Sequence, residues 1–225
     1  LLTNNLYNCS NNYLMDKIAF IDLEGTLVEG SAWNVVKGLF GASKLSSEYG
    51  KLYEDGKVSY HEWRRKLVEI WRERRISRKE FVNSVKDYKL MPGARELIVG
   101  LQNKGFKVVV LTGAISFFAK LVCKDLGIDE FYSAHEFIFD SKGYFLDIKE
   151  HAEYGRGKGK VYFMKKVIAK YNADIRECIA IGGDDINDYW MLKFLRSFSI
   201  KPCINKIKEV VDYEVDSLRN ILDFV

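Results

Sequence analysis

Three short runs of apolar residues, set far apart in the chain, constrain its fold more than any other feature. They are Lys17–Ile21, 106–111 and 178–181, and polar residues or Gly follow each run. A strand that is buried on both faces consists of consecutive apolar residues, because a parallel sheet carries helices on both sides. The three runs therefore predict central strands of one parallel sheet.

Helical patterns separate these runs. Pro92 begins one predicted helix and Gly105 ends it, while a second is expected from Ser116 to Gly127. Strands that alternate with helices are typical of an α/β fold with a doubly wound, Rossmann-like parallel sheet. Such a sheet binds its ligands beyond the carboxyl ends of its strands.

The stretch between the first strand and Pro92 predicts helices only. Ser59 with Glu62, and Ser77 with Glu80, form two capping-box patterns, in which hydroxyl and carboxylate each accept a free amide of the first helical turn. We therefore predict a small helical cap, residues 32–89, inserted after the first strand.

Segments 136–139 and 144–147 flank an Asp-Ser-Lys-Gly turn and predict a β-hairpin. With 225 residues, 48% of them hydrophobic, the chain is large enough for a continuous core. That core domain is expected to comprise residues 15–31 and 90–225.

Residues 1–14 are rich in Asn and carry neither a basic segment nor a sustained apolar run. They do not fit a signal peptide or a membrane anchor, so we expect a loose N-terminal extension. The alternative is that Met15, which opens the first strand, is the natural start of the protein.

The formal net charge is +4, but Lys and Arg are dispersed among 31 acidic residues. This balance permits an anionic substrate without indicating nucleic acid, and no segment has the ~20 apolar residues of a membrane span. The cysteines, Cys9, Cys123, Cys178 and Cys203, lack the spacing of a disulfide framework or a zinc site. We therefore expect a protein of the reducing cytosol, with no membrane or nucleic-acid partner.

Carboxylates follow the first strand, which runs directly into Asp22-Leu23-Glu24-Gly25-Thr26. A strand points alternate side chains to opposite faces, but a loop that begins there can turn both acids toward one ligand. Taken alone, the pattern also fits a turn with solvated acids.

Polar groups also follow the other two strands. Thr112 and Gly113 supply a hydroxyl and an amide that can hydrogen-bond to phosphoryl oxygens. The third strand leads into the acidic loop Gly183-Asp184-Asp185-Ile186-Asn187-Asp188. Magnesium prefers several oxygen ligands, and Asp22 with Asp184 can supply them from neighbouring strands; Asp185 is the alternative.

A basic residue near the start of a helix could bind the same anion, and two are candidates. Counted from Lys160, the helix has an apolar stripe, whereas the matching positions from Lys158 include two lysines. We therefore favour Lys160 and keep Lys158 as the competitor. The stripe consists of Phe163, Met164, Val167 and Ile168.

Taken together, these segments resemble the four motifs of haloacid dehalogenase-like phosphatases. The matching residues are Asp22-Leu-Glu24-Gly-Thr26, Leu111-Thr112-Gly113, a Lys at 158 or 160, and Gly183-Asp184-x-x-Asn187-Asp188. The resemblance covers nearly the whole chain after Met15. The helical insert is similar in place and size to the cap of phosphoserine phosphatases, the most similar branch.

The resemblance implies a magnesium-dependent hydrolase of a small phosphorylated metabolite. Asp22 would attack phosphorus and become an aspartyl phosphate, while Glu24 would act as general acid and then as base. Asp22, the backbone carbonyl of Glu24 and Asp184 would hold the metal. Asn187 and Asp188 would orient the loop or support the ligands.

The sequence departs from the family pattern at Glu24, where the family usually has Asp. The extra methylene moves the carboxyl group by roughly 1.5 Å but preserves its acid-base character. Enolase-phosphatases are similar in carrying Glu at this position, so the change is compatible with phosphatase chemistry.

Substrate-binding residues are harder to carry over. The phosphoserine branch uses an acidic residue nine positions after the nucleophile and a cap arginine, and a gapless reading places Ser31 and Leu67 there. Glu29 and Arg65 lie near enough to substitute, so Ser31 and Arg65 are our candidates for substrate specificity. We expect Trp33, Trp63 and Trp71 to form the core of the cap rather than a pocket.

Two rival interpretations remain. A phosphotransferase or mutase would share the aspartyl phosphate but pass the phosphoryl group to a sugar. A noncatalytic binding protein could keep the fold as a scaffold, although it would have no need for acids at 22 and 24 together with Thr112, a Lys and Asp184.

Overall fold

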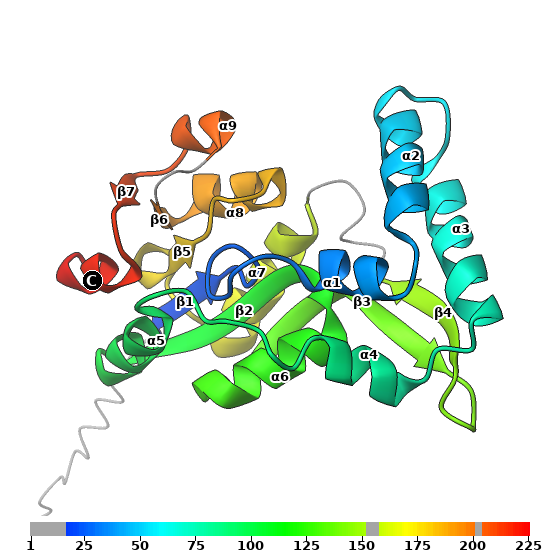
Figure 1. The fold of residues 1–225 in the computed structure, drawn as a ribbon. Helices are drawn as coiled ribbons and strands as arrows, with labels where there is room; N and C mark the ends of the chain where they lie inside the picture. Colours follow the sequence, from blue (N-terminus) through cyan, green and yellow to red (C-terminus); the bar gives the residue numbers. More distant parts are fainter. Residues whose placement is uncertain (1–16, 152–157, 201–203) are drawn as a thin grey trace, which may run out of the picture.

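The computed structural model describes residues 17–151, 158–200 and 204–225. The expected extension 1–14 and the alternative start at Met15 lie outside these residues. Within them the chain forms a seven-stranded sheet in the order β4-β3-β2-β1-β5-β6-β7, in which only β4 is antiparallel to its neighbour (Figure 1). The strands are β1 (Lys17–Ile21), β2 (Phe106–Ile115), β3 (Glu130–Phe139), β4 (Phe145–Glu150), β5 (Ile179–Ile181), β6 (Arg196–Ile200) and β7 (Tyr213–Val215).

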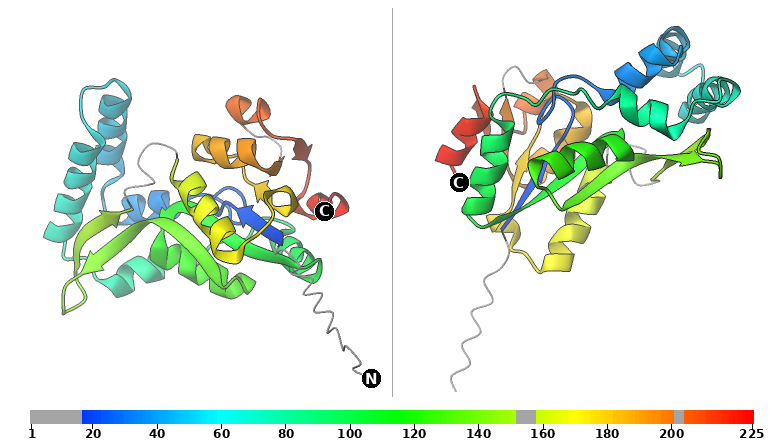
Figure 2. Two further views of the ribbon diagram at one scale, coloured as in Figure 1. Left: turned by 180° about the vertical axis from the view of Figure 1, so that it is seen from behind. Right: turned by 60° about the horizontal axis from the view of Figure 1, so that its bottom comes forward.

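Helices cover both faces of this sheet, with α5 and α6 on one side and α7 and α8 on the other (Figure 2). The predicted α/β, doubly wound class is confirmed. The helices are α1 (Ala32–Leu39), α2 (Ser43–Glu54), α3 (Tyr60–Glu73), α4 (Arg78–Ser84), α5 (Ala94–Asn103), α6 (Ser116–Leu126), α7 (Gly159–Tyr171), α8 (Tyr189–Phe194) and α9 (Asn205–Lys208). Three short 3-10 helices are η1 (Ile175–Glu177), η2 (Ile186–Asp188) and η3 (Leu218–Asp223).

The central strand β1 explains why the apolar runs are continuous. Ala19 and Ile21 belong to the buried cluster beneath α5 and α6, whereas Ile18 and Phe20 belong to the cluster beneath α7. All four side chains are fully buried. Both faces of the strand therefore require apolar residues, as parallel strands inside an α/β sheet do.

The observed strand bounds agree with the predicted ones at the centre of the sheet and differ from them toward its edges. β1 has the predicted bounds, but β2 runs on to Ile115, with a shift of register against β3 after Thr112. β6 and β7 were not predicted. In β6, Ser197 and Ser199 interrupt the apolar run although both are buried, and β7 has only three residues.

Helices α1 to α4, here called the cap helices, follow β1 in the chain. Both predicted capping boxes form: Ser59 Oγ accepts the amide of Glu62 at 3.2 Å and Glu62 Oε2 accepts the amide of Ser59 at 2.8 Å, and α4 begins in the same way. Two connecting segments join these helices to the sheet. They run side by side, since the amide of Glu29 donates to Lys89 O and that of Met91 to Leu27 O, both at 2.9 Å.

The predicted β-hairpin also forms, as the antiparallel pair β3 and β4, and it lies against the cap helices (Figure 1). Trp71 and Phe81 of the cap helices pack on Phe137 and Phe145 of the hairpin, with ring centroids 5.0 to 5.6 Å apart. Such edge-to-face and tilted ring contacts add to the burial of apolar area. Trp71 is thus core, as expected, and the hydrophobic cluster of the cap helices is continuous with that of the sheet.

Candidate active site

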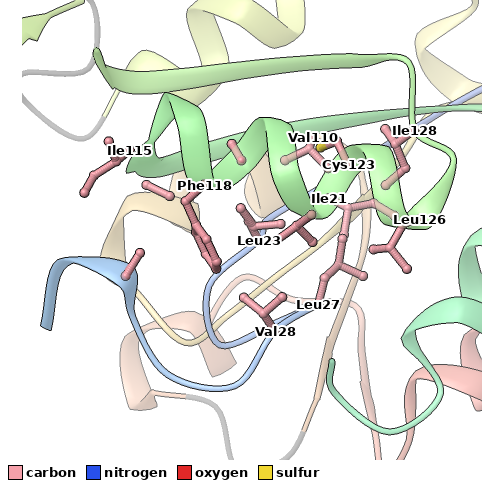
Figure 3. Close-up of a cluster of buried hydrophobic side chains, with 14 of the residues drawn as sticks. Ile21, Leu23, Leu27, Val28, Val110, Ile115, Phe118, Cys123, Leu126 and Ile128 are labelled. Atoms are coloured by element: carbon pink, nitrogen blue, oxygen red, sulfur yellow. The ribbon is translucent and has the colours of Figure 1, made fainter. Parts of the chain in front are cut away.

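Leu23 lies between the two acids that follow β1 and anchors their loop. Its side chain is fully buried beside Ile21 and Leu27 and under α6 (Figure 3). Its carbonyl oxygen accepts the amide of Leu27 at 2.8 Å, which closes the turn. With Leu23 directed into the core, Asp22 and Glu24 both line one cavity of about 300 Å³, called the inner cavity below.

Gly25 allows the β1 loop to approach the acidic loop after β5. Its φ of +73° favours glycine, and a Cβ atom at this position would collide with the carboxylate of Asp184. The amide of Asp22 donates to Ile181 O at 2.9 Å and holds the ends of β1 and β5 together. The side chain of Asp184 therefore packs directly against the backbone of Gly25.

Lys160 forms the centre of the inner cavity. It lies in the first turn of α7, is only 3% exposed, and its Nζ forms ion pairs with Asp22 and, at 2.5 Å, with Asp188 Oδ1. The other carboxylate oxygen of Asp188 accepts the amide of Gly183 at 2.8 Å. Lys158, in contrast, is exposed and lies over the ring of Trp190. Of the two candidate lysines, only Lys160 reaches Asp22.

The charges in this cluster do not balance. The carboxylates of Asp22, Asp184 and Asp188 lie close together, and Lys160 supplies one ammonium group beside them. Burial raises the pKa of Asp22 to about 6 and that of Asp188 to about 7, although Lys160 opposes both shifts. Partial desolvation and the charge of Asp188 raise the pKa of Asp184 to about 6. Burial alone would lower the pKa of Lys160, but the two carboxylates raise it and keep the group protonated.

The surplus negative charge fits a divalent cation. Carboxylate oxygens of Asp22, Asp184 and Asp188 lie within 4.8 Å of one another, and oxygen is the ligand that magnesium prefers. Asp22 and Asp184 line the inner cavity, whereas Asp188 lies behind Lys160 and does not line it, so Asp22 and Asp184 are the better-placed ligands. Asp185 is exposed and caps η2 by accepting the amide of Asn187 at 2.8 Å.

Glu24 joins the inner cavity to the cap helices. Its Oε1 accepts the amide of Ala32, the first residue of α1, at 2.6 Å. Burial raises the pKa of Glu24 to about 7, and the hydrogen bond from Ala32 opposes that shift. A carboxyl group with a pKa near neutrality is suited both to give and to take a proton.

Thr112 and Gly113 lie in β2 at the rim of the same cavity. The hydroxyl oxygen of Thr112 accepts the amide of Ala114 at 3.0 Å, so its hydrogen can be donated to an oxygen in the cavity. Ser31 and Asn187 line the inner cavity too.

A hydrogen-bonded network crosses from the cap helices to the sheet above Gly113. The carbonyl oxygen of Gly113 accepts Trp33 Nε1 at 3.3 Å and lies 3.0 Å from His135 Nδ1, while Tyr60 Oη lies 3.1 Å from His135 Nε2. Burial lowers the pKa of His135 to about 4, so the ring is neutral. Because a carbonyl only accepts, Nδ1 carries the hydrogen and Nε2 accepts from Tyr60.

A larger cavity of about 1040 Å³, the outer cavity, opens from the inner one toward the cap helices. The two share Glu24, Ser31 and Lys160. Arg65 lines neither cavity: its side chain is 59% exposed and lies 3.8 Å from Glu69. The structure thus brings Ser31 to the site and leaves Arg65 on the outer surface of α3.

Sequence reasoning did not single out Tyr60, Arg64 or His135, which all lie at the cavity walls. The signal for α3 was present, because Tyr60, Trp63, Arg64 and Leu67 are spaced i, i+3, i+4 and i+7 and share one helix face. Arg65 falls outside that stripe. His135 had no comparable local signal.

Comparison with known families matches this arrangement. The family model of haloacid dehalogenase-like hydrolases matches residues 17–195. The chain belongs to this hydrolase family. The phosphoserine phosphatase of Methanocaldococcus jannaschii is 24% identical over 212 residues, which cover 93% of this chain and 97% of that protein. The phosphoserine phosphatase of Lactococcus lactis is 26% identical over 210 residues, which cover 91% of this chain and 93% of that protein.

Solved structures agree on the fold. One described as a phospho-aspartyl intermediate analogue of phosphoserine phosphatase superposes with a TM-score of 0.77 at 21% identity, covering 94% of this chain and 99% of its own. The predicted resemblance to haloacid dehalogenase-like hydrolases of the phosphoserine phosphatase-like branch is confirmed. In this hydrolase the predicted residues that line the inner cavity are Asp22, Glu24, Ser31, Thr112, Gly113, Lys160, Asp184, Asn187 and the alternative ligand Asp185, with Asp188 buried behind Lys160.

Proposed function

We propose that this protein is a magnesium-dependent phosphatase that hydrolyses a small phosphomonoester through an aspartyl phosphate on Asp22. The observation that carries the proposal is the ammonium group of Lys160 held between Asp22 and Asp188, beside the carboxylate of Asp184. A carboxylate repels a phosphate dianion, so a nucleophile of this kind needs fixed positive charge beside it. The similarity to the phosphoserine phosphatases of Methanocaldococcus jannaschii and Lactococcus lactis supports the same activity.

In the first step, an oxygen of Asp22 forms a bond to phosphorus and the bond to the leaving oxygen breaks. The carboxyl group of Glu24 gives its proton to that oxygen, which leaves as an alcohol. Thr112 donates its hydroxyl hydrogen to a phosphoryl oxygen, Gly113 lines the same wall, and Lys160 balances the negative charge.

In the second step, the carboxylate of Glu24 takes a proton from water as the water oxygen attacks phosphorus. The bond between phosphorus and Asp22 breaks, inorganic phosphate leaves and both carboxyl groups return to their initial states. Asp22, the backbone carbonyl of Glu24 and Asp184 would hold the magnesium ion, which supplies charge neutralisation to the phosphoryl oxygens. Asn187 and Asp188 would orient the loop that carries Asp184.

We also propose that residues 32–89 act as a cap that selects the substrate, with Ser31 at its edge. The inner cavity contains the groups suited to phosphate and metal, whereas the outer cavity adds aromatic side chains of the cap helices, namely Trp33, Tyr53, Tyr60 and Trp63. Cys123 and Cys178 are free thiols, which supports a reducing compartment such as the cytosol. No helix in the described parts of the chain is long and apolar enough to cross a membrane.

The test is phosphate release from a panel of phosphomonoesters, with magnesium and without an added acceptor. We expect stoichiometric phosphate and alcohol, and a loss of about 10⁴-fold or more in Asp22→Asn, because an amide is not a competent nucleophile. Rapid acid quench and intact-mass analysis should detect one phosphoryl group on the wild-type enzyme during turnover. Release of the alcohol only when a sugar acceptor is present, with phosphorylation of that sugar in place of inorganic phosphate, would identify a phosphotransferase instead.

A further inference from the structure

A third cavity, the side cavity, opens from the outer cavity between α1, α3 and the hairpin and has a volume of about 180 Å³. It shares four residues with the outer cavity, which in turn reaches Glu24 and Lys160. The outer cavity therefore borders both the inner cavity and the side cavity. The apolar and aromatic part of the lining of the side cavity consists of Trp33, Tyr60, Trp63, Leu67, His135 and Ile148.

The size and the walls of the side cavity fit one ring. An apolar cavity of about 150 Å³ is sufficient to bind benzene. Trp33, Tyr60 and Trp63 offer flat aromatic surfaces, against which another ring packs face to edge or in an offset stack. His135 is neutral because burial lowers its pKa to about 4, so it adds no charge to this wall.

Two cations also line the side cavity, and their partners differ. Arg64 donates to the carbonyl oxygen of Ile148 and lies 3.5 Å from Asp147. Lys37, one turn after Trp33 on α1, is half-buried, and no hydrogen bond or ion pair joins its ammonium group to another of the described residues. Burial lowers the pKa of Lys37, and the negative charge of Glu24 opposes this shift, so an added anion would stabilise the ammonium form.

Trp63 supplies a second donor that lacks a partner. Its Nε1 is buried and makes no hydrogen bond within the described parts of the chain. This donor has almost no accessible surface, so a ligand in the side cavity meets the ring of Trp63 and not its Nε1. The ammonium group of Lys37 is therefore the unpaired polar group that the cavity offers to a ligand, within the described parts of the chain. One ammonium group matches the single charge of a carboxylate.

We propose that the side cavity binds the leaving group of the substrate, a single flat ring that carries a carboxylate, and that Lys37 pairs with that carboxylate. This inference rests on the proposed phosphatase function and narrows its substrate class to carboxylated aryl phosphates. A charge-assisted hydrogen bond contributes about 1.5–3 kcal/mol, which corresponds to roughly tenfold or more in kcat/KM.

The test compares 4-carboxyphenyl phosphate with phenyl phosphate, and O-phosphoserine serves as the alternative substrate. We expect the wild-type enzyme to prefer the carboxylated ring by about tenfold or more. Lys37→Met should abolish this ratio, whereas Lys37→Arg, and Lys44→Met on the exposed surface of α2, should keep it. An equal fall for both aryl esters in Lys37→Met, no wild-type preference, or a higher kcat/KM for O-phosphoserine would overturn the inference.

A binding measurement separates this inference from the proposed function. The fluorescence of Trp33 and Trp63 should report binding of 4-carboxyphenyl phosphate to Asp22→Asn, and adding Lys37→Met should weaken that binding about tenfold. Binding that depends on Lys37 in a protein without any turnover would overturn the phosphatase and retain the side cavity as a ligand site. Turnover of aryl esters with binding that is independent of Lys37 would overturn the side cavity alone.

Discussion

The inner cavity, at the carboxyl ends of β1 and β5, is lined by charged groups that are hydrogen-bonded to one another. The walls that the cap helices contribute to the outer and side cavities consist mainly of aromatic rings. At the inner cavity, Lys160 and the Asp188 behind it are almost completely buried, and the polar atoms of both side chains have fixed partners. In the side cavity, Trp33 and Trp63 are only partly buried, and Lys37 has no such partner. The inner cavity therefore suits the phosphoryl group, which all substrates of the reaction have in common. The side cavity suits the leaving group, in which substrates differ.

Replacing Glu24 by Gln should have the largest effect, and the size of that effect should depend on the leaving group. An alkoxide needs a proton in order to leave, so we expect alkyl phosphates to lose about 10²- to 10⁴-fold in kcat/KM. A nitrophenolate leaves without a proton, but the second step still requires activated water. Rapid-quench kinetics should therefore show a burst of about one nitrophenol per enzyme followed by slow turnover. Wild-type rates on both esters would exclude Glu24 as the acid-base group. The proposed division between a catalytic inner cavity and a substrate-binding side cavity would then no longer hold.

Asp184 and Asp185 form a matched pair for the metal. Asp184→Asn removes an anionic ligand that packs on Gly25, and we expect the magnesium concentration for half-maximal activity to rise about 10- to 100-fold. Asp185→Asn, in an exposed residue that caps η2, should change it by less than about twofold. Calorimetric titration with magnesium gives the same comparison without substrate. The opposite ranking would move the ligand to Asp185.

His135 connects Gly113 at the inner cavity with Tyr60 of the cap helices. Its lowered pKa makes the free energy of unfolding depend on pH. Between pH 6.5 and about 4 the unfolded chain binds a proton that the folded protein does not, so the free energy of unfolding falls as the pH falls. The buried carboxyls have raised pKa values and act in the opposite direction, so the difference between the wild type and His135→Asn isolates the histidine. We expect that difference to change by roughly 2 kcal/mol between pH 7 and 4.5 in urea unfolding.

The control for this measurement is His61→Asn, because His61 is exposed on α3. This variant should follow the wild type at every pH. An identical pH dependence in wild type and His135→Asn would show that His135 is not held neutral, and the network through Gly113 would then not join the cap helices to the sheet in the manner described.

Arg65 and Arg64 should give the smallest effects and the sharpest contrast within one helix. Sequence reasoning expects Arg65→Ala to change the ranking of substrates, but the exposed position of Arg65 leads us to expect changes below about twofold for every substrate. Arg64→Ala removes the bond to Ile148 O at the wall of the side cavity and should alter the ranking more. Steady-state kinetics on the ester panel decides, and a change of ranking in Arg65→Ala alone would restore the original interpretation.

The sequence predicted those parts of the molecule whose signals are local. The run Lys17–Ile21 is β1, and the two capping boxes begin α3 and α4. Lys160 was favoured over Lys158 from the apolar stripe of α7, and that helix buries Val161, Phe163, Met164 and Val167 together with Lys160. These elements depend on neighbours within one or two turns of the chain.

The remaining parts depend on contacts between distant segments. In β6, Ser197 interrupts the apolar run, and its buried hydroxyl is paired with Asp212, fifteen residues away. The side cavity joins α1 and α3 to the hairpin, so no single segment carries its pattern. Trp33 and Trp63 line it although cap core was expected for them, and Trp71, the third of that set, is core.

The hairpin has a consequence for how specificity could be exchanged between relatives. It is bonded to the cap helices through the backbone, since the amide of Phe145 donates to Ile76 O and that of Arg78 to Gly143 O, both at 2.8 Å. Phe137 and Phe145 also complete the hydrophobic cluster around Trp71. A chimera that transplants residues 32–89 alone would therefore bring foreign aromatic surfaces and backbone partners to this hairpin. The transferable module is discontinuous and consists of the cap helices together with the β3–β4 hairpin.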